Sequence, residues 1–384
     1  MSVPALRFRG FSGDWEVKIL GEETIWNSGG TPSKQINSYW DGDIPWISAS
    51  SMRGIKYFES DLKITKEGLL NGSKLALKNS LLLLVRGSML FNKIPVGIAI
   101  KDIAFNQDVK SIRAKESLTS YFLLYWFMAS EHKMLNMVTG TGIGAGKLDT
   151  QDLLSLNLIL PSLPEQTKIV NFLTAVDEKI SLLTQKADFL SQYKKGVMQQ
   201  IFSQELRFKD DDGQEFPEWE EKTLGDISLK KSSNIAANKI ESNVGEYKIY
   251  GAAGILKSVD FFTQDDAYIS IVKDGAGVGR VFLCEPQTSV LGTLDIIQPK
   301  ENINISFLYA VIEQIDFVIY VTGSTIPHIY FKDYSKEIIS IPSLPEQTKI
   351  ANFLTAIDEK ITINQTQLNA VKQYKQGLLQ QMFV

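Results

Sequence analysis

The chain of 384 residues is poor in several features that mark common classes of protein. It has a single cysteine, Cys284, and therefore cannot form an internal disulfide, which suits a reducing compartment such as the cytoplasm. Its two histidines, His132 and His328, stand far apart, with no Cys or carboxylate cluster at metal-ligand spacing. We therefore expect no metal site, and we expect each histidine to serve as a structural or contact residue.

Long apolar runs are also missing. The most apolar windows, Leu81 to Val85 and Tyr121 to Ala129, are shorter than the run of about eighteen residues that a membrane span needs. The first ten residues, MSVPALRFRG, lack the apolar core of a secretion signal. The sequence therefore predicts a cytoplasmic protein with no membrane partner.

The chain also lacks a strong charge of either sign. Its net charge is -4, so it has no overall basic footprint of the kind that marks many nucleic-acid binders. Residues 1–160 carry 18 Lys and Arg against 15 Asp and Glu, whereas residues 217–341 carry 11 against 17. If the second segment binds DNA, it needs a local basic face or a partner, because sequence-independent affinity comes largely from neutralising phosphates.

Motifs of catalysis are scarce. The N-P-P-Y loop with which adenine methyltransferases hold a flipped base does not occur, and we expect no catalytic residue. One stretch, TGTGIGAGK at Thr139 to Lys147, is similar to a nucleotide-binding loop. The match is incomplete, because Thr141 replaces the first glycine of a P-loop and Leu148 replaces its Ser or Thr. A nucleotide-binding enzyme using Gly140 to Lys147 stays an alternative.

What the sequence does contain is an internal repeat. PSLPEQTKIVNFLTAVDEKI begins at Pro161 and returns as PSLPEQTKIANFLTAIDEKI at Pro342, with eighteen of twenty positions identical at an offset of 181. A weaker repeat pairs LRF and DWEVKILGE, from Leu6 and Asp14, with LRF and EWEEKTLGD, from Leu206 and Glu218. The chain is therefore two copies of one unit, each a globular segment followed by the repeated segment.

The repeated segment predicts a long helix. Ser162 and Glu165, like Ser343 and Glu346, fit a capping box with a proline in the first turn. Each helix would span about 38 residues, on the order of 57 Å. Apolar residues then recur in steps of three and four, interrupted by Lys194 and Lys375. The predicted seam comprises Ile169, Leu173, Val176, Ile180, Leu183 and Leu190 in the first copy and Ile350, Leu354, Ile357, Ile361, Asn364 and Leu368 in the second.

Such a seam indicates two long helices packed on one another, with Asn364 fixing the register. The alternative is that each helix packs only on its own globular segment. Short β-rich runs and a few helical windows, Ser120 to Met137 and Ser306 to Tyr320 among them, predict mixed α/β domains. The fold class is therefore α/β, with domains at 1–160 and 217–341, helical spacers at 161–203 and 342–384, and a linker at 204–216.

This order of segments resembles the specificity subunit of type I restriction-modification systems. The resemblance covers essentially the whole chain and rests on the duplicated PSLPEQTKI together with GGTPSK, GDIPWIS, YGAAGI and FPEWEEKTLGDI. It implies two target recognition domains, each reading one half of a bipartite asymmetric site in double-stranded DNA. It also implies that the two repeated helices form an antiparallel coiled coil, which sets the unspecified spacer between the halves. It also implies two modification subunits, which bind S-adenosylmethionine and methylate adenine, and restriction subunits that cleave. A scaffold that joins partner subunits without reading DNA is the other alternative.

Candidate DNA contacts follow from side-chain chemistry. Arg and Lys reach guanine edges or phosphates, and hydroxyl groups favour phosphates. Arg86 and Lys273 each end an apolar strand, and a Gly flanked by hydroxyl residues precedes the helix in both copies. The candidates are Lys34, Arg53, Lys56, Arg86, Ser88, Lys93, Thr139, Thr141 and Lys147 in the first domain, and Lys248, Tyr250, Lys273, Arg280, Thr322, Ser324 and His328 in the second.

Overall fold

The computed structural model describes residues 3–142 and 144–383 and divides into two compact units. Unit 1 comprises Met1–Leu183 and Gln367–Val384, and unit 2 comprises Thr184–Thr366. The two longest helices, α5 (Leu163–Phe202) and α9 (Leu344–Met382), contribute a part to each unit. The two compact units therefore meet within the long helices, whereas the sequence predicted domain boundaries at the ends of these helices.

Unit 1 contains a mixed α/β head, the first head. Its largest sheet has the order β2-β11-β7-β9-β4, and a second has the order β5-β3-β10-β6. The pair β1-β14 and the small sheet β12-β13-β8 complete it. The elements are β1 (Glu16–Ile19), β2 (Thr24–Ser28), β3 (Trp40–Ile47), β4 (Lys56–Tyr57), β5 (Lys63–Ile64), α1 (Lys66–Gly72), β6 (Lys74–Ala76), β7 (Leu81–Leu84), β8 (Arg86–Gly87), β9 (Val96–Ala99), β10 (Ile103–Phe105), β11 (Val109–Ala114), α2 (Ser120–Ala129), α3 (Glu131–Leu135), β12 (Thr139–Gly140), β13 (Gly146–Lys147), α4 (Thr150–Leu154) and β14 (Asn157–Leu160).

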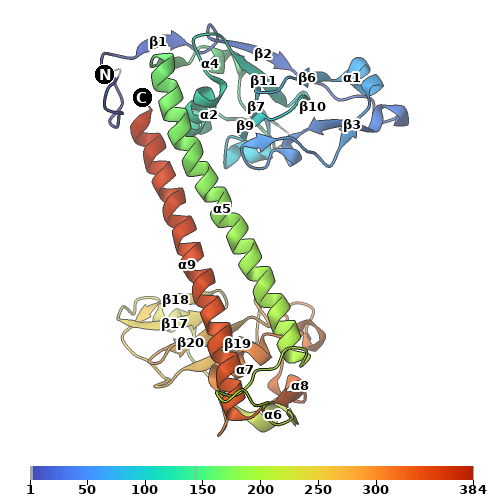
Figure 1. Cartoon of the computed structure of the whole chain (residues 1–384), viewed down its shortest axis with the longest axis vertical. Helices are drawn as coiled ribbons and strands as arrows, with labels where there is room; N and C mark the ends of the chain where they lie inside the picture. The colour runs from blue at the N-terminus through green and yellow to red at the C-terminus, as the bar shows by residue number, and fades with distance from the viewer. Residues whose placement is uncertain (1–2, 143, 384) are drawn as a thin grey trace. The chain divides into compact units, whose positions relative to one another are not determined.

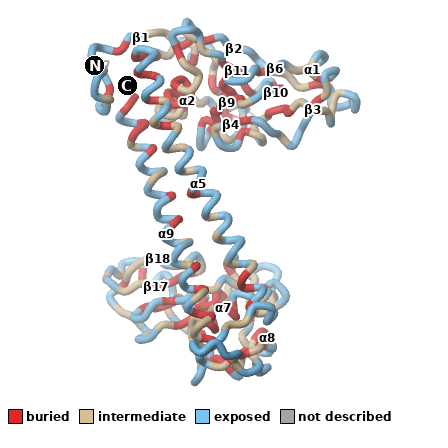
Figure 2. The backbone as a smooth tube through the Cα atoms, in the orientation of Figure 1, coloured by how far each residue is buried: buried red, intermediate tan, exposed pale blue. Residues whose placement is uncertain are grey.

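The first head is built around the apolar runs that stood out in the sequence. Strand β7 is completely buried between β11 and β9, as expected for a continuous apolar strand at the centre of a sheet. Helix α2 begins at the Thr119 cap, whose side chain accepts the Phe122 N–H, and buries six consecutive residues against the sheet. These windows therefore serve as core, as Figure 2 shows.

Unit 2 contains the second head, with the sheets β16-β22-β19-β20 and β18-β17-β21 and the pair β15-β23. Strand β19 is again completely buried between two antiparallel neighbours. The elements are β15 (Glu220–Thr223), α6 (Leu224–Ile227), β16 (Ser228–Ser232), β17 (Tyr247–Gly251), β18 (Gly254–Val259), β19 (Tyr268–Val272), β20 (Val281–Cys284), β21 (Ser289–Val290), β22 (Leu294–Pro299), α7 (Ile305–Ile312), α8 (Phe331–Tyr334) and β23 (Ile338–Ile341).

The long helices pack together along the predicted seam. All twelve predicted seam residues are buried or half-buried. Ile169 and Leu173 lie in the core of the first head, beside Leu378 and Met382 from α9. In unit 2 the core contains both the start of α9 and the end of α5. The helices therefore contact one another and their own heads at once, so the two packing hypotheses are both correct in part.

The two lysines that interrupt the seam form ion pairs between the helices. Lys375 Nζ lies 2.5 Å from Asp177 in unit 1, and Lys194 Nζ lies 2.8 Å from Asp358 in unit 2. The offset of 181 relates these two pairs exactly. In each unit, a residue early in one helix meets a residue late in the other, so the helices run antiparallel (Figure 1). Because an unpaired buried charge is costly, the pairs favour a single register.

The predicted capping box does not form, and its carboxylate has another use. Glu165 is 1% exposed and accepts two hydrogen bonds from Arg7, at 2.7 and 2.8 Å. Glu346 does the same with Arg207, at 2.9 and 3.1 Å, and the buried Ser343 hydroxyl has no partner among the described residues. A bidentate pair between arginine and a carboxylate is stronger than a hydrogen bond from one backbone N–H. The two glutamates therefore bind arginine and do not cap their helices.

The next residue of the repeat joins the helix to its head. Gln166 accepts the Thr119 N–H and donates to the carbonyl oxygens of Ser117 and Pro161. Its counterpart Gln347 accepts the Asn304 N–H, at the cap of α7, and donates in the same way to Asn302 and Pro342. Both amides are buried and make three hydrogen bonds, so each head is fixed to its helix by the same contacts.

Candidate nucleic-acid interface

The small sheet β12-β13-β8 brings together candidate contact residues from distant parts of the first head. Lys147 lies opposite Arg86 on one side and opposite Thr139 on the other. Ser88 follows directly in the 3-10 helix after β8. Arg86, Thr139 and Lys147 are exposed, and Arg86 forms no ion pair with any described residue. Separate sequence signals thus converge on one surface, the Arg86 cluster, defined by Arg86, Ser88, Thr139, Thr141 and Lys147.

The local backbone explains why glycine is needed in this cluster. A Cβ atom on Gly146 would lie 2.9 Å from Val138 and 3.0 Å from Leu90, so a larger residue would push the hairpin off the head. Gly87, with φ of 150°, adopts a conformation that L residues avoid. The chain can therefore turn sharply from the buried strand β7 and present Arg86 at the surface.

Other polar groups of the cluster already have partners within the chain. The Thr141 hydroxyl donates to the Ala145 carbonyl oxygen at 2.9 Å, and the Lys147 ammonium lies 3.2 Å from Asp149. A backbone hydrogen bond from Gln151, followed by the contact with Lys147, lowers the pKa of Asp149, so this carboxylate keeps its charge. A phosphate would have to displace Asp149 before it could bind Lys147. Arg86 has no such acidic partner among the described residues, so it is the cation of the cluster that is available to bind a phosphate.

The second head repeats this arrangement at the backbone level. His328 lies opposite both Asp274 and Thr322, as Lys147 lies opposite Arg86 and Thr139. The Ile329 N–H donates to the Lys273 carbonyl oxygen, as the Leu148 N–H does to that of Val85. The two heads therefore share a three-segment surface after the central buried strand.

This register corrects the proposed equivalence of Arg86 and Lys273. Asp274 occupies the place of Arg86, and Lys273 occupies the place of the buried Val85. The predicted alignment of the two heads was wrong by one residue here, because Arg86 and Lys273 both follow an apolar run of similar length. Lys273 also lies 3.6 Å from Asp274, so the second surface presents a paired charge where the first presents an arginine.

Several candidates of the second head are held by internal contacts. Lys248 forms a hydrogen bond with Glu285 at 2.6 Å, and this bond raises the pKa of Lys248, so the lysine stays protonated and paired. Arg280 donates to the Ala252 carbonyl oxygen, and the Thr322 hydroxyl donates to that of His328. Ser324 is exposed near the tip of the Thr322–His328 turn. Tyr250 is 6% exposed in the core, so its assignment as a DNA contact is wrong.

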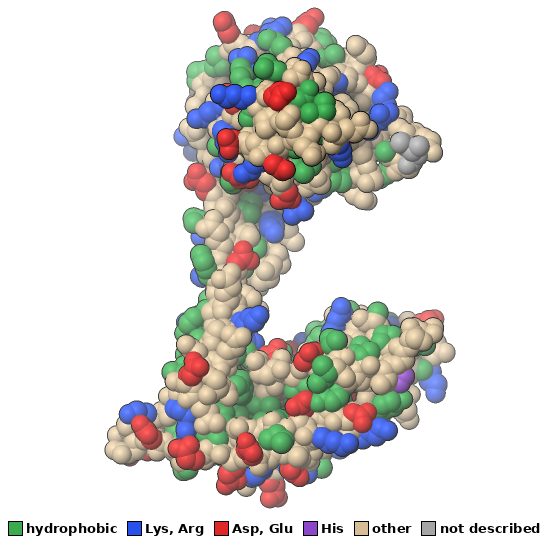
Figure 3. Space-filling model, turned by 90° about the vertical axis from the view of Figure 1, so that its right-hand side faces the viewer, with side chains coloured by type: hydrophobic (Ala, Val, Ile, Leu, Met, Phe, Trp, Pro, Cys, Tyr) green, Lys and Arg blue, Asp and Glu red, His purple; other side chains and the backbone are tan. Residues whose placement is uncertain are grey.

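The remaining candidates of the first head do not join the Arg86 cluster. Lys34, Arg53, Lys56 and Lys93 are all exposed. Lys34 lies in the loop before β3, and Arg53 lies just before β4. Lys56 and Lys93 line two hollows between the head and the long helices. On the face that Figure 3 shows, charges of both signs are interspersed.

The structure speaks against the nucleotide-binding alternative. The stretch Thr139 to Lys147 is a hairpin of β12 and β13, with Ile143 outside the described residues. A phosphate-binding loop of the P-loop or dinucleotide type connects a strand to the start of a helix. Here Lys147 lies within a strand, and the next helix, α4, spans only five residues. The glycines of this stretch therefore belong to a β-hairpin and not to a phosphate-binding loop.

Sequence reasoning missed the residues that attach each head to its helix. Glu165 and Gln166, like their counterparts Glu346 and Gln347, are buried, and the half-buried Arg7 and Arg207 bind the two glutamates. Phe8 packs edge-on against Phe172, and Phe208 packs in the same way against Phe353. The signal was available, since LRF and PEQ are repeated in both copies, but only the fold shows that these repeats contact one another.

Comparison with known proteins agrees with this architecture. The profile of the type I restriction modification DNA specificity domain matches residues 12–192 and 217–373, one match for each half of the duplicated chain. The chain belongs to this family. Its predicted fold class is also confirmed, with two such domains and two long helices that pack together.

Two curated specificity subunits illustrate the range of similarity. The MjaIX subunit of Methanocaldococcus jannaschii is 25% identical over 402 residues, covering 95% of this chain and 92% of the relative. The EcoR124I/EcoR124II subunit of Escherichia coli is 31% identical over 175 residues, covering 45% and 43%. The crystal structure of a type I S subunit from M. genitalium shares the fold, with a TM-score of 0.69 at 17% identity and coverage of 100% and 99%.

Among the described residues, none of the helices is both long and apolar enough to cross a bilayer. The long helices α5 and α9 instead carry many polar and charged residues, most of them exposed.

Proposed function

We propose that this specificity-domain protein reads a bipartite, asymmetric site in double-stranded DNA. Each head reads one half of the site, and the long helices set the length of the unspecified spacer. The chain itself performs no catalysis. The head surfaces formed by the Arg86 cluster and by its counterpart at Asp274, Thr322 and His328 meet the DNA.

One observation carries this proposal. The same attachment, an arginine on Glu165 or Glu346 and a buried amide at Gln166 or Gln347, holds two unlike heads on two nearly identical helices. Identical mounting of different surfaces is what a reader of two different half-sites requires. A scaffold that only joined subunits would have no use for surfaces that present Arg86 in one copy and Asp274 in the other.

Partner subunits supply the chemistry. Two modification subunits bind S-adenosylmethionine and methylate one adenine in each half of the site, and restriction subunits join the complex to cleave. The long helices are the natural platform for the modification subunits, because their sequence is repeated and a repeated surface takes two copies of one partner. The matched relatives are named as subunits of type I restriction enzymes, which supports this assignment.

The test is to express the chain with the modification subunit of its system and to map methylated adenines across a host genome. The expected motif has two specified halves separated by a fixed number of unspecified base pairs. A contiguous palindrome, or methylation without any motif, would contradict the proposal.

A further inference from the structure

The second head presents a surface whose hydrogen-bonding chemistry differs from that of the Arg86 cluster. We call it the Asp274 surface and define it by Asp274, Thr322 and His328. His328 lies opposite both Asp274 and Thr322 in short strand pairs. Residues directly opposite each other project to the same side of a sheet, so the three side chains share one face. They can therefore be compared, position by position, with their counterparts in the Arg86 cluster.

The Asp274 carboxylate is available to a ligand. Its side chain is 40% exposed, and no described residue donates a hydrogen bond to it. Lys273 Nζ lies 3.6 Å from its Oδ2, which is longer than a hydrogen bond. Lys273 therefore offsets the negative charge that would repel DNA, while the carboxylate oxygens can still accept hydrogen bonds.

The His328 ring is held in one orientation. Its Nδ1 lies 3.1 Å from the Ile326 carbonyl oxygen. Because a carbonyl oxygen only accepts, Nδ1 carries the hydrogen, and Nε2 of the neutral ring presents a lone pair. A Cβ atom on Gly323 would lie 2.8 Å from Nδ1, so glycine lets the ring lie against the turn, and Tyr330 packs edge-on against the ring. The neutral ring therefore adds a second acceptor beside Asp274.

The third side chain of the surface also presents only lone pairs. The Thr322 hydroxyl donates its one hydrogen to the His328 carbonyl oxygen at 3.2 Å. The backbone N–H groups of Thr322 and His328 donate to each other's carbonyl oxygens. All three side chains of the Asp274 surface therefore offer acceptors, and neither N–H of this pair is left to bind a ligand.

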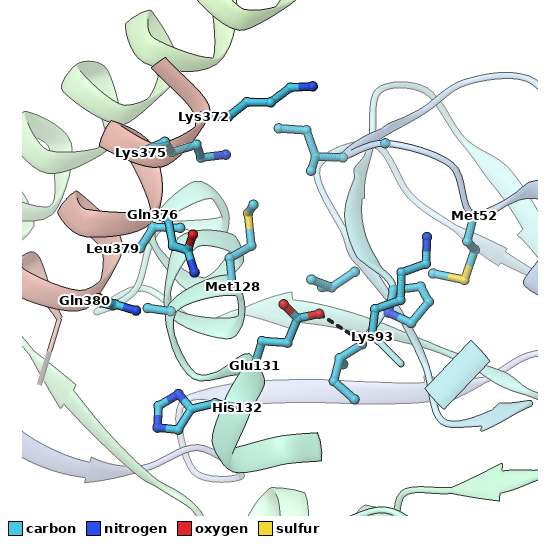
Figure 4. Close-up of a pocket in the computed structure, with 16 residues that line it drawn as sticks. Met52, Lys93, Met128, Glu131, His132, Lys372, Lys375, Gln376, Leu379 and Gln380 are labelled. Atoms are coloured by element: carbon cyan, nitrogen blue, oxygen red, sulfur yellow. Dashed lines mark hydrogen bonds between the residues drawn. The ribbon is translucent and has the colours of Figure 1, made fainter. Parts of the chain in front are cut away.

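The first head presents the opposite chemistry at the equivalent positions. Asp274 occupies the place of Arg86, and His328 occupies that of Lys147. A guanidinium and an ammonium group only donate hydrogen bonds. Lys93 follows Arg86 in the chain but lines a separate hollow between the head and α9, shown in Figure 4, so it does not enter this comparison. One head thus presents donors where the other presents acceptors.

This difference limits what the Asp274 surface can contact on DNA. Phosphate oxygens are acceptors, so a surface of acceptors gains no hydrogen bond from the backbone. The donors in the major groove are the amino groups of cytosine N4 and adenine N6. Thymine O4 and guanine O6 are acceptors in the corresponding places. A carboxylate therefore favours an amino base and disfavours the keto base that replaces it, thymine for cytosine or guanine for adenine.

We propose that Asp274, with the neutral His328 beside it, reads the amino group of a cytosine or an adenine in the major groove of one half-site. The first head, by contrast, reads acceptors through Arg86. The inference rests on the proposed function in one respect, since it takes the Asp274 surface to be the place where the second head meets DNA. It goes further because it assigns opposite hydrogen-bonding roles to the two halves of one site.

The test is Asp274→Asn, which keeps the shape of the side chain and adds an amide donor. The full-length chain is expressed with its modification subunit, and methylated adenines are mapped. One position in one half of the motif, restricted to an amino base in the unsubstituted complex, should now also accept the corresponding keto base, while the other half stays the same. The matched control is Asp266→Asn, an exposed aspartate before β19, and it should leave the motif unchanged.

Titration of the assembled complex provides the second arm. The unsubstituted complex should bind the mapped site about tenfold or more tightly than a site with the keto base at that position. Asp274→Asn should lose most of this ratio, and so should Asp274→Ala, which removes the acceptors without adding a donor. An unchanged motif and ratio in both variants would overturn the proposal. So would an equal gain in affinity for every DNA sequence, which is the effect of a carboxylate that only repels phosphates. A missing bipartite motif in the unsubstituted complex would instead count against the proposed function.

Discussion

Arg86 is the side chain on which the proposed DNA-reading role of the first head depends most. It stands at the edge of the β12-β13-β8 sheet, next to Lys147, and it is the exposed cation of the cluster that no described acidic residue neutralises. Its planar group can donate two parallel hydrogen bonds to guanine or to a phosphate. Lys147, by contrast, must first leave Asp149.

Substitution Arg86→Ala should weaken specific DNA binding by the assembled complex by about 1–3 kcal/mol, because a bidentate contact is lost. The loss is measured by titrating DNA that carries the mapped site, with Arg113→Ala, an exposed arginine on β11, as the matched control. Relaxed specificity should appear in one half of the site only. Equal affinity of the Arg86→Ala and unsubstituted complexes would remove Arg86 from the interface.

At the residue scale, the sequence indicated which residues belong to one surface better than it indicated strand register or burial. It identified the hydroxyl and basic residues of the 139–147 hairpin, and the fold places them beside Arg86. It misaligned Lys273 by one position and assigned a surface role to Tyr250, which lies in the core. Strand register and burial depend on pairing with distant segments, so a local pattern of apolar and basic residues does not determine them.

At the scale of elements, the two lysine–aspartate pairs determine how α5 and α9 meet. Asp177 also accepts a hydrogen bond from Tyr125 at 2.8 Å, and Lys194 also lies 3.3 Å from Glu313. Each pair is thus tied to a helix of its own head, α2 in one case and the end of α7 in the other. Lys194 and Lys375, which interrupt the apolar seam, therefore help to link the helix pair to the heads.

Substitution Lys375→Ala should lower the free energy of unfolding by about 3 kcal/mol, because it leaves a largely buried carboxylate at Asp177 without its cation. Replacing both partners, as Asp177→Leu with Lys375→Met, should recover part of the loss. Denaturant unfolding measures both variants, with Lys372→Ala as the control on the same helix. If Lys375→Ala were as stable as the control, the pair would have no structural role.

The long helices were the elements that the sequence predicted best. Their period of 3.5 residues and their prolines predicted the start, the length and the packing of one helix on the other, and the resemblance to the family implied the antiparallel direction. The helices span 40 and 39 residues. The details at the helix start were wrong, because a capping box is a local rule and Arg7 approaches Glu165 from 158 positions away. Tertiary contacts override a local preference when they offer a stronger bond.

At the scale of the whole molecule, charge limits what the chain can do alone. The second head has six more acidic than basic residues, and several of its lysines are already paired. We therefore expect its attraction for the phosphate backbone to be weak, and in the proposed function the partner subunits supply much of the sequence-independent affinity.

The purified chain alone should therefore bind its own site weakly, and binding should become tight once modification subunits are added. A titration over a range of salt concentrations measures this, because the salt dependence counts the phosphates that each assembly neutralises. Tight, sequence-specific binding by the isolated chain would show that the heads need no partner.

In the proposed function, the heads read the halves of the site while the helices set the distance between them. Inserting one heptad at equivalent positions of α5 and α9 keeps the seam in phase and lengthens both helices by about 10 Å. Methylated adenines are then mapped in cells that express this variant with the modification subunit. The expected motif has the same two specified halves with a longer spacer between them. New specified bases in either half, or an unchanged spacer, would contradict it.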